Sequence, residues 1–66
     1  MCLSDAFELV GTERRPLMNY VSGISVENNT ITLTDMLGAR KIVTGNLKSV
    51  DLTHNIILIE TVENAQ

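Results

Sequence analysis

The sequence is poor in the features that mark several classes of protein. Among its 66 residues there is one Cys, which excludes an internal disulfide and therefore a cysteine-stapled scaffold. Five Lys and Arg against eight Asp and Glu give a net charge of −3, so the chain lacks the basic surface expected of a nucleic-acid binder. No apolar run approaches the ~18–20 residues that cross a bilayer, and no charged stretch followed by an apolar one marks the chain for export. These absences favour a small, acidic, cytoplasmic protein.

Aromatic residues are equally scarce, and this matters because the chain is short. Phe7 and Tyr20 are the two aromatics and there is no Trp, so the core must come from Val, Ile and Leu. Ordering a chain of this size costs on the order of 100 kcal/mol, at roughly 1.5 kcal/mol per residue. A domain this small buries only about 60% of its unfolded surface, which barely offsets that cost. We therefore expect residues 1–66 to form a single domain that needs a metal or a partner subunit, and the argument favours a homodimer.

The residues that are abundant indicate strands. Val, Ile and Thr occur in every third of the chain and favour an all-β fold. In residues 24–33, two alternating runs flank Asn28-Asn29, a pair that tolerates the positive φ of a two-residue type I′ turn. This turn pairs Val26 with Ile31 and puts all four apolar residues of the hairpin on one face. We predict a small antiparallel sheet or barrel of about six or seven short strands joined by tight turns.

Further strands and turns are expected around this hairpin. They are a first strand at residues 2–10, a short strand or single helical turn at 17–21, a tight turn at 35–38, a strand at 39–43 that Gly45-Asn46 ends, and a strand at 47–52. A two-residue turn at His54-Asn55 would pair Leu52 with Ile57. This pattern predicts antiparallel neighbours along most of the chain.

The last predicted strand, residues 56–59, is apolar on both faces. If Ile57 and Ile59 face the core, Ile56 and Leu58 point outward, where a half-exposed strand carries polar residues. Such a patch is usually covered. Either a second subunit or the chain's own ends are expected to cover it.

Nothing in the sequence indicates catalysis. A hydrolytic or acid–base enzyme needs a nucleophile, a base and an orienting group within reach of one another. The single His, His54, lies in a predicted turn and is most simply a solvated residue. The carboxylates are spread along the chain, and no phosphate loop, dinucleotide fingerprint or paired-Cys zinc spacing occurs. We therefore expect a protein that is not an enzyme.

Cys2 is the residue whose position suggests chemistry. A Cys is most often a small core hydrophobe. Next to the amino terminus, however, the Met1 amine, the Cys2 amide nitrogen and the Cys2 thiolate can bind one metal in two five-membered chelate rings. Three donors in one plane suit Ni(II) or Cu(II) better than tetrahedral zinc. The Cys2 thiolate of a second subunit would supply the fourth donor, which links this metal site to the expected dimer.

The same residues carry a resemblance to a known family. Met1-Cys2-Leu3 at the start, followed in order by residues 31–38, 45–52 and 57–60, resembles the CooT proteins, small accessory proteins of carbon monoxide dehydrogenase maturation. The resemblance implies an all-β homodimer that binds one Ni(II) between its subunits through Cys2 and acts as a metallochaperone for that enzyme or its other nickel accessory proteins. Met36-Leu37-Gly38 stands where family members often have an aromatic residue. We interpret this departure as a packing change at the tip of a turn, where it would also change the surface offered to a partner.

Two other functions stay open on the sequence. One is a small RNA-binding barrel that uses Arg14-Arg15 and Arg40-Lys41, although the acidic balance and the few aromatics oppose it. The other is a metal-free module that docks on a protein through its outward-facing apolar residues, with Cys2 inert.

Overall fold

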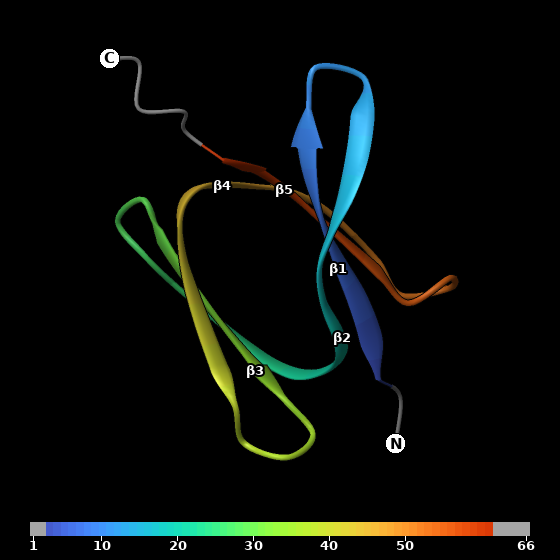
Figure 1. Ribbon diagram of the computed structural model, residues 1–66, viewed down its shortest axis with the longest axis vertical. Coiled ribbons are helices and arrows are strands. Elements are labelled where there is room, and N and C mark those ends of the chain that lie inside the picture. Colours follow the sequence, from blue (N-terminus) through green and yellow to red (C-terminus); the bar gives the residue numbers. More distant parts are fainter. Residues whose placement is uncertain (1–2, 62–66) are drawn as a thin grey trace.

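The β-forming residues of this chain build one closed sheet. The computed structural model describes residues 3–61. Its strands are β1 (Ser4–Val10), β2 (Glu13–Glu27), β3 (Thr30–Asp35), β4 (Arg40–Asp51) and β5 (Ile56–Thr61), and these residues contain no helix. Consecutive strands pair antiparallel, while β5 returns parallel to β1 and closes a barrel (Figure 1). The predicted all-β fold is confirmed, with one parallel pair as its closure.

The hairpin formed by β2 and β3 has the predicted register. Val26 pairs with Ile31 and Glu27 with Thr30, as the alternating pattern requires. Asn28 has the expected positive φ, 56°, but its neighbour in the turn does not, so the turn is not of type I′. The backbone N–H of Gly45 donates to the carbonyl of that neighbour, Asn29, at 2.8 Å. The alternation therefore fixed which residues pair, while β4 helps to hold the turn.

The described chain has five strands, fewer than the six or seven expected, because two predicted breaks are bends within long strands. Residues 17–21 belong to β2, in which Tyr20 has a φ of 58° and the register shifts after Val21. Gly45 lies inside β4, where a Cβ atom would meet the carbonyl oxygen of Glu60 and lie 2.7 Å from a backbone Cα of β5. Glycine there lets two backbones approach closely instead of ending a strand.

The connection between β4 and β5 is longer than predicted. Residues 52–55 form a four-residue turn, and Val50, not Leu52, pairs with Ile57. A carboxylate oxygen of Asp51 accepts two backbone N–H groups of this loop, at 3.0 and 3.1 Å, which favours the longer turn. The predicted pairing was wrong by two residues, a shift that leaves residues 49–51 on their predicted faces, while a further register shift between Leu47 and Ser49 places Leu47 opposite Ile59.

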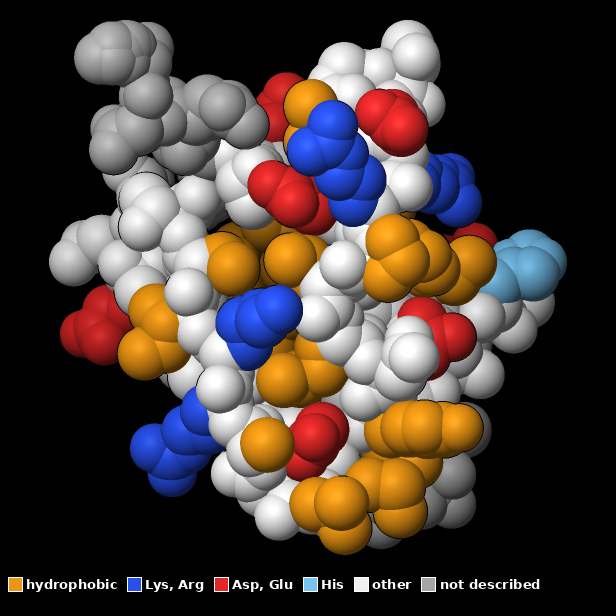
Figure 2. All heavy atoms as spheres, viewed as in Figure 1, with side chains coloured by type: hydrophobic (Ala, Val, Ile, Leu, Met, Phe, Trp, Pro, Cys, Tyr) orange, Lys and Arg blue, Asp and Glu red, His pale blue; other side chains and the backbone are white. Residues whose placement is uncertain are grey.

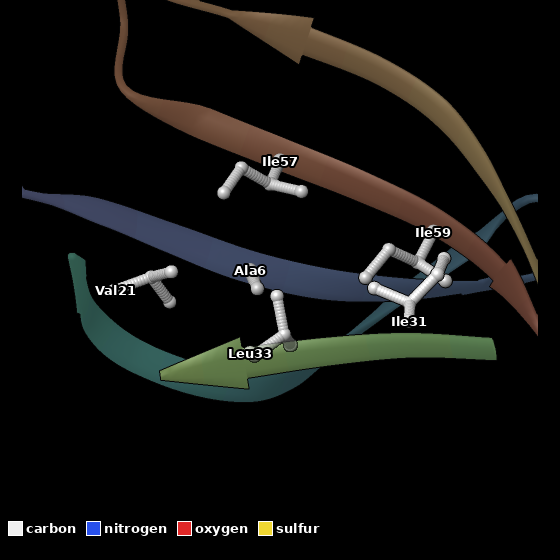
Figure 3. Close-up of a cluster of buried hydrophobic side chains, with 6 residues drawn as sticks. All are labelled: Ala6, Val21, Ile31, Leu33, Ile57 and Ile59. Atoms are coloured by element: carbon white, nitrogen blue, oxygen red, sulfur yellow. The ribbon is translucent and has the colours of Figure 1, made fainter. Parts of the chain in front are cut away.

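The core is aliphatic, as the composition predicted. Its buried side chains come from four strands and point into the barrel (Figure 3): Ala6, Val21, Ile31, Leu33, Ile57 and Ile59. Leu17, Met18 and Val43 pack against them. The prediction that Ile57 and Ile59 face the core is confirmed, and Phe7 is only half-buried.

Two of the four apolar residues predicted to share one face of the hairpin at residues 24–33 lie outside this core. Ile31 and Leu33 are fully buried, yet their partners Val26 and Ile24 are 51% and 37% exposed. β1 pairs with β2 only as far as Val21, so beyond that residue the described part of β2 has a neighbour on one side alone. The sequence pattern predicts a shared face, but it does not predict where a neighbouring strand ends.

Candidate metal centre at the start of the first strand

The two predicted metal ligands, Met1 and Cys2, lie outside the described residues. The described residues begin with Leu3, and β1 begins with Ser4. What the structure describes is therefore the surface at the start of β1, and the other candidate metal donors of residues 3–61.

The start of β1 is held from both sides. Ser4 pairs with Val21 of β2, and Asp5 pairs with Ile56 of β5. The backbone N–H of Asp5 also donates to the carbonyl of Asn55 at 2.9 Å, which joins β1 to the loop before β5. Because two strands and a loop position it, the backbone at the start of β1 has a defined place on the barrel.

An apolar groove lies beside the start of β1. It has a volume of about 160 Å³ and is lined by residues of β1, β2, β4, β5 and the loop that follows β4: Ser4, Val21, Ser22, Gly23, Ile24, Val50, Leu52 and Ile57. Leu52 is 79% exposed and Val50 is 44% exposed. A large apolar side chain exposed to that degree beside an apolar groove is typical of a surface that contacts another chain. The sequence did not single out this groove, because it forms only where β2 leaves β1 and where the loop at Leu52 is longer than predicted.

The remaining candidate donors do not gather elsewhere in the described chain. Within residues 3–61, no group of three or more His, Asp or Glu side chains is placed to hold a metal ion. His54 lies in the predicted turn region with its side chain 70% exposed, and its Nδ1 is 2.9 Å from Oδ2 of Asp51. That hydrogen bond, with the backbone N–H groups of the loop, lowers the pKa of Asp51 below its ordinary value of 3.8. His54 and Asp51 together stabilise a loop.

The outward-facing residues of β5 line a second cavity. Ile56 and Leu58 are half-buried and contribute to a surface cavity of about 310 Å³, together with Arg14, Ser49, Asp51 and His54. The prediction that these two residues point away from the core agrees with the buried positions of Ile57 and Ile59. Which chain covers them stays a prediction.

These features define the protein first as a small, closed all-β barrel with an apolar groove beside its first strand. The sequence model of a family described as the CO dehydrogenase accessory protein CooT matches residues 1–60. The chain therefore belongs to the CooT family, as its residues predicted.

A solved structure supports the fold. The crystal structure of a protein assigned as CooT from Carboxydothermus hydrogenoformans superposes with a TM-score of 0.85 at 22% sequence identity, covering 94% of this chain and 100% of that chain. At this identity the likeness concerns the fold. No curated protein is a significant match to the chain. Among residues 3–61 there is no helix of the length and apolar character that a membrane crossing requires.

Proposed function

We propose that this chain is a nickel carrier of the CO dehydrogenase system, which binds Ni(II) as its cargo at a site shared by two subunits. The observation that carries the proposal is the family match, which begins at residue 1 and so includes Met1 and Cys2. The family's description as accessory to CO dehydrogenase names the enzyme that the cargo would serve. The role is binding and transfer, without catalysis by this chain.

The chemistry of the proposed site follows from the donor atoms. The Met1 amine, the Cys2 amide nitrogen and the Cys2 thiolate give two chelate rings in one plane, which Ni(II) accepts. A thiolate is a soft donor whose affinity for the metal rises as the thiol loses its proton. The Cys2 thiolate of the second subunit completes the set of four, so one ion is bound for every two chains.

The surface around the start of β1 supports the shared site. Two residues of chain span at most about 7 Å, so a metal bound at Cys2 lies close to Ser4. Ser4 lines the apolar groove, and Leu52 and Ile24 at that groove are exposed. A second subunit that covers this groove would bring its own first strand, and therefore its own Cys2, to the same place. The proposed dimer and the proposed metal site thus use one surface.

Nickel titration of the purified chain tests this function. We expect one Ni(II) per two chains, with a thiolate-to-nickel absorption band that rises during the titration. Cys2→Ser should abolish the band and weaken binding strongly, since it replaces the soft thiolate by a hydroxyl. Ser25→Ala is the matched control, because Ser25 is an exposed residue of β2 that does not line the groove. Unchanged tight binding in Cys2→Ser would remove Cys2 from the mechanism.

A further inference from the structure

The turn between β3 and β4 exposes a second apolar surface. Met36 and Leu37 at its tip are 56% and 87% exposed, and Tyr20 of β2 is 60% exposed. The backbone N–H of Met36 donates to the carbonyl of Tyr20 at 2.9 Å, so these three residues are neighbours and are called the turn patch below. Figure 2 shows hydrophobic side chains gathered at the lower end of the molecule, over the β3–β4 turn and the bend of β2. Turns are ordinarily polar. Three large apolar side chains exposed at and beside one turn therefore indicate a binding surface.

The backbone beneath the turn patch is well fixed. Oδ1 of Asp35 accepts the N–H groups of Leu37 and Ala39, both at 2.9 Å. The N–H of Gly38 donates to the carbonyl of Asp35 at 3.0 Å, and the N–H of Asp35 donates to the carbonyl of Ala39 at 2.9 Å. A turn held by four hydrogen bonds fixes the backbone that carries Leu37. Such preorganisation reduces the entropy lost when a partner binds.

The backbone of Tyr20 adds a second sign of function. Its φ of 58° lies in the left-handed region, which is unfavourable for a bulky residue. The hydrogen bond from Met36 and the hydroxyl of Ser22, which donates to the carbonyl of Asp35 at 3.0 Å, hold this bend of β2 against the turn. Strained residues of this kind gather at binding sites. Here the strained residue is aromatic, and its backbone is joined to that of the exposed Met36.

Basic residues flank the turn patch. Arg40 and Lys41 follow the turn directly and supply two of the five Lys and Arg in a chain whose net charge is −3. The Asp35 carboxylate, the nearest acidic group in sequence, accepts hydrogen bonds from the turn itself. Arg40 is exposed, and Lys41 donates to the carbonyl of Leu17 at 3.2 Å. The surface that complements this arrangement is an apolar pocket bordered by Asp and Glu.

We propose that the turn patch is the docking surface for the enzyme that receives the metal, and that Leu37 enters an apolar pocket of that enzyme whose rim is acidic. This rests on the delivery role proposed above, but not on which atoms bind nickel. The turn patch adjoins the groove beside Ser4, because Tyr20 directly precedes the groove residues Val21 and Ser22, so a docked enzyme would lie next to the proposed metal site.

Binding of the chain to nickel-free CO dehydrogenase, measured by biolayer interferometry, tests the proposal. We expect Leu37→Ser to bind about tenfold or more weakly, as expected for the loss of a central anchor. Arg40→Glu should also weaken binding, and high salt should reduce that difference since it screens charge. Val26→Ser is the matched control: Val26 is 51% exposed at the opposite end of the β2–β3 hairpin, and this variant should bind like the unmodified chain.

Three outcomes would overturn the docking proposal. The first is that the unmodified chain does not bind the enzyme. The second is that Leu37→Ser binds as tightly as the unmodified chain. The third is that Leu37→Ser converts a dimer to a monomer in sedimentation. The last outcome would assign the turn patch to a second copy. Circular dichroism of each variant establishes that it folds, with Leu37→Gln as a second variant at the same position. Nickel titration of the same samples keeps the two proposals apart, because loss of nickel binding with normal docking would contradict only the proposed metal site.

Discussion

At the scale of single residues, glycine and asparagine determine where this chain bends. Gly45 allows β4 to approach β5 so closely that a Cβ atom would lie 2.7 Å from the Cα of Thr61. Gly23, also in a strand, has room for a Cβ, whose nearest neighbour would be Cβ of Thr34 at 3.9 Å. Two glycines that look alike in the sequence thus differ in what they allow. The difference comes from the partner strand, which the local sequence does not contain.

This contrast gives a prediction for the two glycines. Gly45→Ala should lower the free energy of unfolding by about 2 kcal/mol or more, because the atoms that the new methyl meets are backbone and move only if β4 and β5 separate. Gly23→Ala should change it by less than about 1 kcal/mol. Urea denaturation of both variants measures these values. Equal losses in the two variants would contradict the role assigned to Gly45.

Asn28 gives a second prediction at this scale. Its φ of 56° is tolerated by Asn and Gly but is costly for a β-branched residue. Asn28→Val should therefore cost about 1–2 kcal/mol in the free energy of unfolding, while Asn28→Gly should stay near the starting value. Thermal unfolding of the two variants provides the measurement. A Val variant as stable as the Gly variant would show that the turn relaxes to another conformation.

At the scale of the strands and turns, the sequence predicted pairing better than it predicted strand length. The alternation in residues 24–33 specified the register of the β2–β3 hairpin correctly, because a shift by one residue would reverse both faces. The pairing of Val50 with Ile57 was missed, because a register shift of two residues does not change the face on which a side chain lies. The length of the loop alone then determines the register. The bends inside β2 and β4 were predicted to be strand ends. A glycine or an irregular stretch has the same local sequence pattern whether the strand bends there or ends there.

The loop at residues 52–55 leads to a prediction about pH. The hydrogen bond with His54, and then those from the loop N–H groups, lower the pKa of Asp51 in the folded chain. A carboxyl whose pKa is lowered by folding stabilises the fold above its ordinary pKa of 3.8, and that contribution is lost as the pH falls from there through the folded pKa. Asp51→Asn keeps an oxygen that accepts the two N–H groups but removes the titration.

We therefore expect the stability difference between the chain and Asp51→Asn to narrow as the pH falls below about 4, where the Asp51 carboxyl becomes protonated. Urea denaturation of both proteins across the acid range measures the difference. His54→Gln, which removes the imidazole, should reduce the same pH dependence without abolishing it. A difference that is independent of pH would contradict the role of the Asp51–His54 pair.

At the scale of the whole molecule, the family and the fold class were predictable, but the surfaces were not. The order of short motifs, with Cys at position 2, predicted the CooT family, and the match over residues 1–60 confirms it. The groove beside Ser4 depends on where β1 stops pairing with β2, and the turn patch depends on a bend at Tyr20. Both are set by contacts between distant parts of the chain. Met1 and Cys2 as ligands stay a prediction from the sequence.

The proposed dimer gives a prediction for the intact protein. If two chains share the groove beside Ser4, a tenfold increase in protein concentration should stabilise the dimer by about 1.4 kcal/mol, and the melting temperature should rise with it. Leu52→Ser should weaken this dependence, since Leu52 is 79% exposed at the groove. Val26→Ser again serves as the control variant. A melting temperature that is independent of concentration would contradict a dimer coupled to folding.

The parallel pairing of β1 with β5 has a consequence for how the protein is made. Four pairings join strands that are neighbours in the chain, but the closing one joins Asp5 to Ile56 and Glu8 to Ile59. Contacts between such distant residues form late, because the intervening loop must close first. During synthesis, therefore, the first strand leaves the ribosome long before the strand that completes its surroundings. The strands that flank the start of β1 are therefore complete only after the last part of the chain has been made.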